Sequence, residues 1–98
     1  MDSKIIRVGT FSIIKLDIEG YKLKSSLTYY ILRENGIQYG YLPDLDLKAD
    51  HFGLFEVDKS LKNQIVELYE KFVLIDDNKL NEMDKLKKEL LISLVEKD

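Results

Sequence analysis

Three aspartates and the single histidine form the most chemically promising group in this sequence: Asp44, Asp46, Asp50 and His51. Carboxylates and an imidazole could together bind a divalent cation. An EF-hand calcium loop is excluded, because lysine and alanine stand where that loop needs an oxygen ligand and a glycine. Aspartate alternating with leucine is more typical of a solvated turn. We therefore predict no metal and no other cofactor.

His51 could also serve as the general base of a hydrolase, with Asp46 or Asp50 orienting its ring. No serine lies in a Gly-x-Ser-x-Gly elbow, and the chain has no glycine-rich phosphate loop. Cysteine is absent, which excludes disulfides, thiolate metal sites and cysteine nucleophiles. We predict no catalytic residue and no enzymatic activity. A metal-dependent or histidine-based hydrolase is the weaker alternative.

Tyrosines form a second group of interest at Tyr29, Tyr30, Tyr39 and Tyr41. Exposed tyrosines stack on nucleic-acid bases or anchor protein interfaces, and buried ones pack across neighbouring strands. Basic residues are scattered and the formal net charge is −3, so nucleic acid is disfavoured as a partner. Sheet packing and a protein interface both stay open. We name these four tyrosines as candidate partner-binding residues.

The elements that hold these groups follow from a change in apolar spacing near residues 57–60. Before this point apolar residues alternate, and after it they recur every three or four residues. The pattern predicts an α+β fold: a small antiparallel sheet of three to five strands, a meander of hairpins, followed by a C-terminal two-helix hairpin packed on one face. We predict a single domain over residues 1–98, β-rich over 1–57 and helical over 58–98.

Two hairpins are predicted in the β-rich part. The first joins residues 10–18 to residues 21–24 through a Glu19-Gly20 turn, and a short strand over residues 4–8 precedes it. The second joins residues 28–33 to residues 38–42 around Asn-Gly, the strongest short hairpin signal. The second turn sets two cross-strand pairs: Tyr30 with Tyr41, and Leu32 with Tyr39.

Downstream of Pro43, residues 44–50 are predicted to form an acidic loop and residues 51–57 a further strand. Asp58 or Ser60 is expected to cap the first helix. The apolar stripe of that helix comprises Leu61, Ile65, Leu68, Tyr69 and Phe72. The core-facing seam predicted for the second helix comprises Leu80, Met83, Leu86, Leu90 and Leu94.

Leu91 and Val95, together with Ile92, widen the apolar arc of the second helix beyond the stripe that a surface helix buries. This excess has two interpretations that the sequence does not separate. The C-terminus is fully packed within one chain, or it forms a homodimer or partner surface. We name Leu91 and Val95 as candidate partner-binding residues.

The function we predict is that of a small non-enzymatic protein that binds another protein. A phage or mobile-element accessory protein that inhibits a host protein is its finer form, with the acidic segment Asp44–Asp50 occupying a basic groove. The alternative is a small-ligand sensor with a pocket lined by Tyr29, Ile31, Leu42 and Phe55. No signal peptide is visible, and the apolar runs are shorter than the roughly 20 residues that span a bilayer. We expect a cytoplasmic location and no membrane contact.

Overall fold

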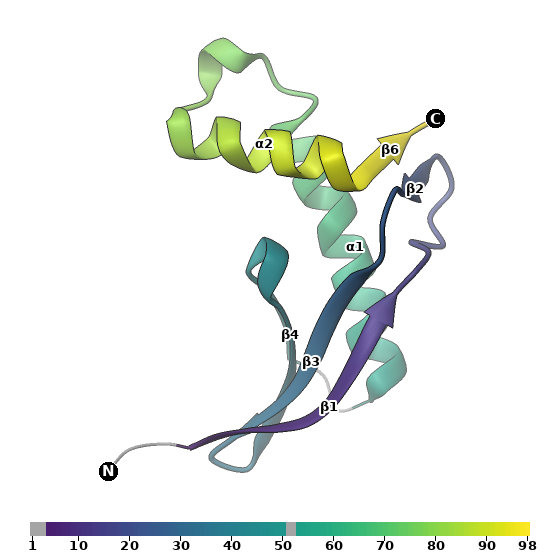
Figure 1. The fold of residues 1–98 in the computed structure, drawn as a ribbon, viewed down its shortest axis with the longest axis vertical. Helices are drawn as coiled ribbons and strands as arrows, with labels where there is room; N and C mark the ends of the chain where they lie inside the picture. The colour runs from purple at the N-terminus through teal and green to yellow at the C-terminus, as the bar shows by residue number, and fades with distance from the viewer. Residues whose placement is uncertain (1–3, 51–52) are drawn as a thin grey trace. The chain divides into compact units, whose positions relative to one another are not determined.

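The computed structural model describes residues 4–50 and 53–98 of the 98-residue chain (Figure 1). It confirms the α+β class, because an antiparallel four-stranded sheet is followed in sequence by two helices. The strands are β1 (Ile5–Ile13), β2 (Tyr21–Leu23), β3 (Leu27–Glu34), β4 (Ile37–Leu42), β5 (Leu47–Ala49) and β6 (Val95–Lys97). The helices are α1 (Leu54–Phe72) and α2 (Glu82–Leu94), with the single 3-10 turns η1 (Pro43–Leu45) and η2 (Asp77–Lys79).

The described residues form two compact units, each assembled from separate stretches of sequence. Unit 1 contains the described residues up to Ile13 and those from Leu27 to Leu61. Unit 2 contains Ile14–Ser26 and Lys62–Asp98. Each unit combines strand and helix, so the units do not coincide with the β-rich and helical halves of the sequence. The single domain over residues 1–98 stays a prediction.

The hairpin β3–β4 lies at the centre of the sheet in unit 1, whose strand order is β1-β3-β4-β5. Asn35 and Gly36 both have positive φ, 53° and 77°, as the tight two-residue hairpin turn requires. The predicted register is confirmed: Tyr30 is opposite Tyr41, and Leu32 is opposite Tyr39. Local turn chemistry therefore fixes this part of the fold.

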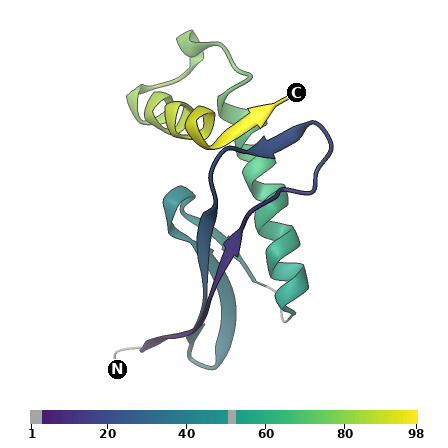
Figure 2. The ribbon, with the colours of Figure 1, turned by 45° about the vertical axis from the view of Figure 1, so that its right-hand side comes forward.

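The first predicted hairpin is wrong, although its turn forms. Gly20 has a φ of 89°, and the N–H of Tyr21 donates to the carbonyl of Ile18 at 3.2 Å. The flanking segments nevertheless pair elsewhere: β1 pairs with β3, and β2 pairs with β6 (Figure 2). The ladder of β1 with β3 extends over most of the nine residues of β1. A hairpin of β1 with the short strand β2 would form fewer ladder hydrogen bonds.

Helix α1 begins earlier than predicted. It starts at Leu54, so the predicted strand is wrong over residues 53–57, and Asp58 and Ser60 lie inside the helix instead of capping it. His51 and Phe52 lie outside the described residues. The first helical bond joins the N–H of Val57 to the carbonyl of Gly53 at 3.1 Å. The apolar residues here suit a buried helix as well as a strand, which explains the error.

The predicted acidic loop over residues 44–50 is also more regular than expected. Pro43 opens the turn η1, which suits a residue with a fixed φ and no N–H. Asp46 follows it in the left-handed region, with a φ of 51°. Strand β5 then pairs antiparallel with β4, and Leu47 is opposite Leu42.

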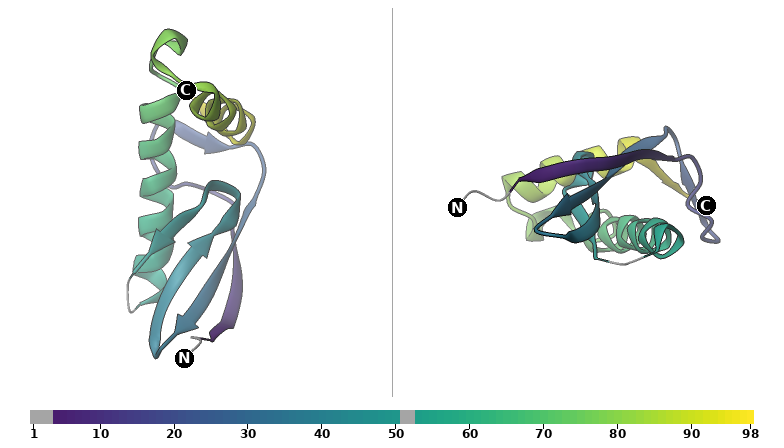
Figure 3. Two further views of the ribbon diagram at one scale, coloured as in Figure 1. Left: turned by 90° about the vertical axis from the view of Figure 1, so that its left-hand side faces the viewer. Right: turned by 90° about the horizontal axis from the view of Figure 1, so that it is seen from below.

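One face of the sheet packs against the first turns of α1 (Figure 3). Leu27, Tyr29 and Ile31 alternate with half-exposed residues along β3, and all three are buried. Gly40 on β4 allows the close approach of the helix, because a Cβ at this position would overlap Cγ1 of Val57. The opposite face of the sheet carries the intervening residues of β3 and β4.

Unit 2 has its own core, beneath the short β2–β6 ribbon. Its fully or largely buried side chains are Leu16, Ile65, Val66, Tyr69, Phe72, Leu91 and Val95. The ring of Tyr21 meets that of Tyr69 edge-on, with centroids 5.8 Å apart. Neither helix of the described residues is long and apolar enough to cross a membrane.

Candidate functional site

The tyrosines of the β3–β4 hairpin divide into a buried pair and a half-exposed pair. Tyr29 is buried, stacks on Phe11 with centroids 5.6 Å apart and donates its hydroxyl to Asp58 at 3.1 Å. Tyr39 is also buried, and the ammonium of Lys48 lies 4.7 Å from its ring centroid. The structure places both rings inside the chain, where they contribute to packing in this conformation. Their partner-binding role stays a prediction.

Tyr30 and Tyr41 are half-exposed on the sheet face turned away from α1. The guanidinium carbon of Arg7 lies 5.7 Å from the ring centroid of Tyr30, a cation–π geometry. The hydroxyl of Tyr41 donates to Asp46 at 3.0 Å, and this hydrogen bond raises the pKa of Tyr41 above its usual 10.0. These two tyrosines therefore remain partly accessible, with the ring of Tyr30 in contact with Arg7 and the hydroxyl of Tyr41 bonded to Asp46 within unit 1.

The acidic segment is exposed at all three predicted aspartates. Asp44, Asp46 and Asp50 point to solvent, and Leu45 and Leu47 between them are buried. The alternation of aspartate with leucine thus reflects the turn η1 and strand β5. Among the described residues, which leave out His51, no group of three or more histidine, cysteine, aspartate or glutamate side chains could hold a metal ion.

Helix α2 is rotated relative to the prediction. Leu91 has no exposed surface and Val95 is 1% exposed, so the structure places both inside the chain rather than at its surface. The predicted core-facing seam is wrong at its centre: Met83 is 75% exposed, Leu86 is 61% exposed and Leu90 is 39% exposed. We call these three residues the α2 stripe.

Charged residues occupy part of the inner side of α2. Lys87 and Lys88 are half-buried, and the ammonium of Lys87 lies 5.3 Å from the ring centroid of Phe72. Their methylene chains cover apolar surface while their charged ends reach polar or aromatic groups. The helix therefore half-buries two lysines and exposes four large apolar side chains, those of the α2 stripe and Ile92. A surface helix usually does the opposite.

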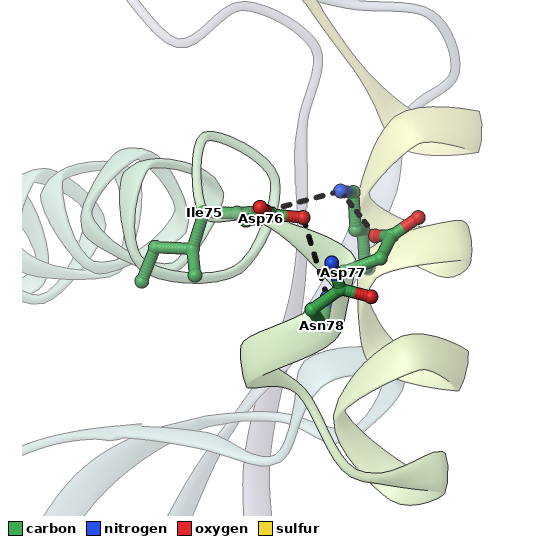
Figure 4. A network of polar contacts seen from close by, with 5 residues as sticks. Ile75, Asp76, Asp77 and Asn78 are labelled. Carbon is green, nitrogen blue, oxygen red and sulfur yellow. Dashed lines mark hydrogen bonds and ion pairs between the residues drawn. The ribbon is translucent and has the colours of Figure 1, made fainter.

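A polar network fixes the loop before α2 to the helix (Figure 4). The ammonium of Lys88 donates to the carboxylate of Asp77 at 2.6 Å and to the carbonyl of Ile75 at 3.3 Å. The N–H of Asn78 donates to the carboxylate of Asp76 at 3.3 Å, which caps η2. Lys88 holds the pKa of Asp77 below its usual value of 3.8. This network accounts for the inward position of Lys88.

A pocket of about 510 Å³ lies within the first segment of unit 2. Its lining residues are Ile14, Lys15, Leu16, Asp17, Ile18, Glu19, Tyr21, Lys22 and Leu23. The ammonium of Lys62 donates to Asp17 at 2.8 Å and lowers the pKa of that carboxyl. The lining shares no residue with the ligand pocket expected from the sequence, because Tyr29, Ile31 and Leu42 are buried in the core and Phe55 is 75% exposed.

Comparison with known proteins adds no functional assignment. No protein-family model matches the chain, and no curated protein or solved structure matches it either. The candidate sites therefore rest on geometry alone. Sequence reasoning missed the α2 stripe as a surface because helical spacing reveals an apolar face but not the direction in which that face points.

Proposed function

We propose that this chain is a non-enzymatic protein that acts by binding another protein through the α2 stripe. One observation carries the proposal: Met83, Leu86 and Leu90 are exposed on a helix that half-buries Lys87 and Lys88. Contiguous apolar surface of this kind is costly in water and marks interaction sites in small proteins. A partner that covers the stripe removes that cost.

The spacing of the stripe fits a known mode of recognition. Met83, Leu86 and Leu90 stand at positions i, i+3 and i+7, which are the anchor positions of a helix that binds in an apolar groove. At about 100° per residue, Glu82 and Glu89 fall along one side of the stripe. The partner we propose therefore offers an apolar groove with basic residues on the matching rim.

The finer expectation, an inhibitor from a phage or mobile element, stays a prediction. A homodimer through α2 is the competing occupant of the same surface. In an antiparallel pair of α2 helices the acidic sides would face each other, and the like charges would weaken that pair. This consideration favours a different protein with a basic rim.

Site-specific photo-crosslinking tests the proposal. A benzophenone amino acid replaces Leu86 in one variant and Glu67, an exposed residue of α1, in a control variant. We expect a crosslinked partner from position 86 but not from position 67. The purified partner should then bind the wild-type chain and lose at least about tenfold in affinity with Leu86→Glu, but not with Glu67→Lys.

Two outcomes would overturn the proposal. The first is equal crosslinking from both positions, or none from either, which would leave the α2 stripe without a specific partner. The second is a product that contains only two copies of this chain, which would assign the stripe to a homodimer. Circular dichroism of each variant confirms that a loss of binding does not come from a loss of folding.

A further inference from the structure

Strand β1, which contains no residue of the α2 stripe, lies at one edge of the four-stranded sheet (Figure 1). It extends over nine residues from Ile5 to Ile13, and in the described part of the chain no strand pairs with its outer side. An edge strand presents alternating N–H and C=O groups that can accept another strand. Natural edges of this length are normally shortened, charged or covered.

The side chains of this edge favour strand pairing. Ile5 and Ile6 are each 56% exposed and Val8 is 48% exposed, and all three are β-branched residues with high strand propensity. The ladder of β1 with β3 is interrupted once, by a bulge between Arg7 and Gly9. One regular stretch remains on each side of this bulge, and neither stretch contains a proline.

The charge of this segment indicates what kind of strand would pair with it. Residues 4–13, which comprise β1 and the residue before it, contain Lys4 and Arg7 and no carboxylate, although the whole chain has 18 acidic and 15 basic residues. A second copy would add only positive charge, from its own Lys4 and Arg7, beside the Lys4 and Arg7 of this strand. An acidic strand would instead bring opposite charges together across the ladder, which is favourable.

We propose that the β1 edge binds an extended acidic segment of another protein by strand addition. Main-chain hydrogen bonds supply affinity, and alternate side chains of the added strand supply selectivity. Arg7 lies over the ring of Tyr30, so its guanidinium is on the sheet face turned away from α1. The acidic side chains of the added strand lie on that face, and its apolar side chains lie beside Ile6 and Phe11 on the other.

A pair of synthetic peptides tests the charge requirement. The first probe is a capped, fluorescent nonapeptide of alternating valine and glutamate, and the second has lysine in place of glutamate. We expect the acidic peptide to bind about tenfold more tightly than the basic one, and to bind less tightly at higher salt. A third peptide, the acidic one with a central proline, should lose binding because proline removes a ladder hydrogen bond.

Variants of the protein test the position of the site. Arg7→Glu should weaken the acidic peptide about tenfold, whereas Lys79→Glu makes the same charge change in η2 and should leave affinity unchanged. Amide hydrogen exchange should slow along β1 when the acidic peptide is bound. Equal affinity for both charged peptides, no binding at millimolar concentration, protection outside β1, or a dimer formed through β1 would each refute the proposal.

Discussion

The rotation of α2 can be tested by comparing two leucines on the same helix. Leu91 has no exposed surface and Leu86 is 61% exposed, so alanine at these two positions should have very different effects on the free energy of unfolding. The sequence-based seam instead includes Leu86 as a core residue, and the sequence leaves the burial of Leu91 open. Two simple substitutions therefore distinguish the two orientations of the helix.

The expected magnitudes follow from burial. Leu91→Ala removes a fully buried side chain and leaves a cavity, which typically costs about 2–5 kcal/mol. Full burial of a leucine is worth about 1.5–3 kcal/mol, so the buried part of Leu86 contributes no more than roughly 1 kcal/mol. Alanine also has a slightly higher helix propensity, which offsets a few tenths of a kcal/mol. Leu86→Ala should therefore cost less than about 1 kcal/mol.

Urea unfolding followed by circular dichroism measures both values. The dependence of the free energy on denaturant should be the same for the two variants, so that the difference reports stability and not a change in the unfolded state. A loss for Leu86→Ala equal to or greater than that for Leu91→Ala would refute the observed orientation of α2. The same result would remove the basis for the α2 stripe as a binding surface.

Three further predictions concern packing and ionisation. Gly40→Ala should destabilise the protein by about 1–3 kcal/mol, because the added methyl group overlaps Val57. A double-mutant cycle checks this cause: Val57→Ala should destabilise the Gly40→Ala variant less than it destabilises the wild-type protein. The free energy of unfolding should fall as pH drops below about 3.8, because the pKa of Asp77 is lowered in the folded state and protonation breaks its ion pair with Lys88. Unfolding measured as a function of pH should show a smaller fall for Asp77→Asn. Asp46→Asn should bring the pKa of Tyr41 back toward 10.0 in a carbon NMR titration, and an unchanged pKa would exclude the hydrogen bond as its cause.

The sequence predicts those parts of the fold that depend on local chemistry. The Asn35-Gly36 turn needs two residues that tolerate positive φ, and it alone fixes the register of β3 with β4. The Glu19-Gly20 turn also forms, but it does not select partners for the strands around it. Those partners are distant in the sequence, and no local pattern marks them.

The same limit of sequence-based prediction applies to the side chains of the candidate sites. Spacing identifies Met83, Leu86 and Leu90 as one face of a helix, and that much is correct. The direction of this face depends on what the rest of unit 2 places against the helix, which periodicity does not contain. The half-exposed positions of Tyr30 and Tyr41 likewise depend on which sheet face α1 covers.

The orientation of α2 is held by one contact at its C-terminal end and one at its middle, and the outward direction of the stripe follows from them. At the C-terminal end the chain passes directly from α2 into β6, and the N–H of Lys24 donates to the carbonyl of Leu94 at 2.8 Å. Midway along the helix, Lys88 bonds to the preceding loop at Asp77. Rotation that buries Met83 would break both connections and expose Leu91. The helix cannot cover its own apolar face without these losses, and this supports the proposal that a binding partner covers the α2 stripe.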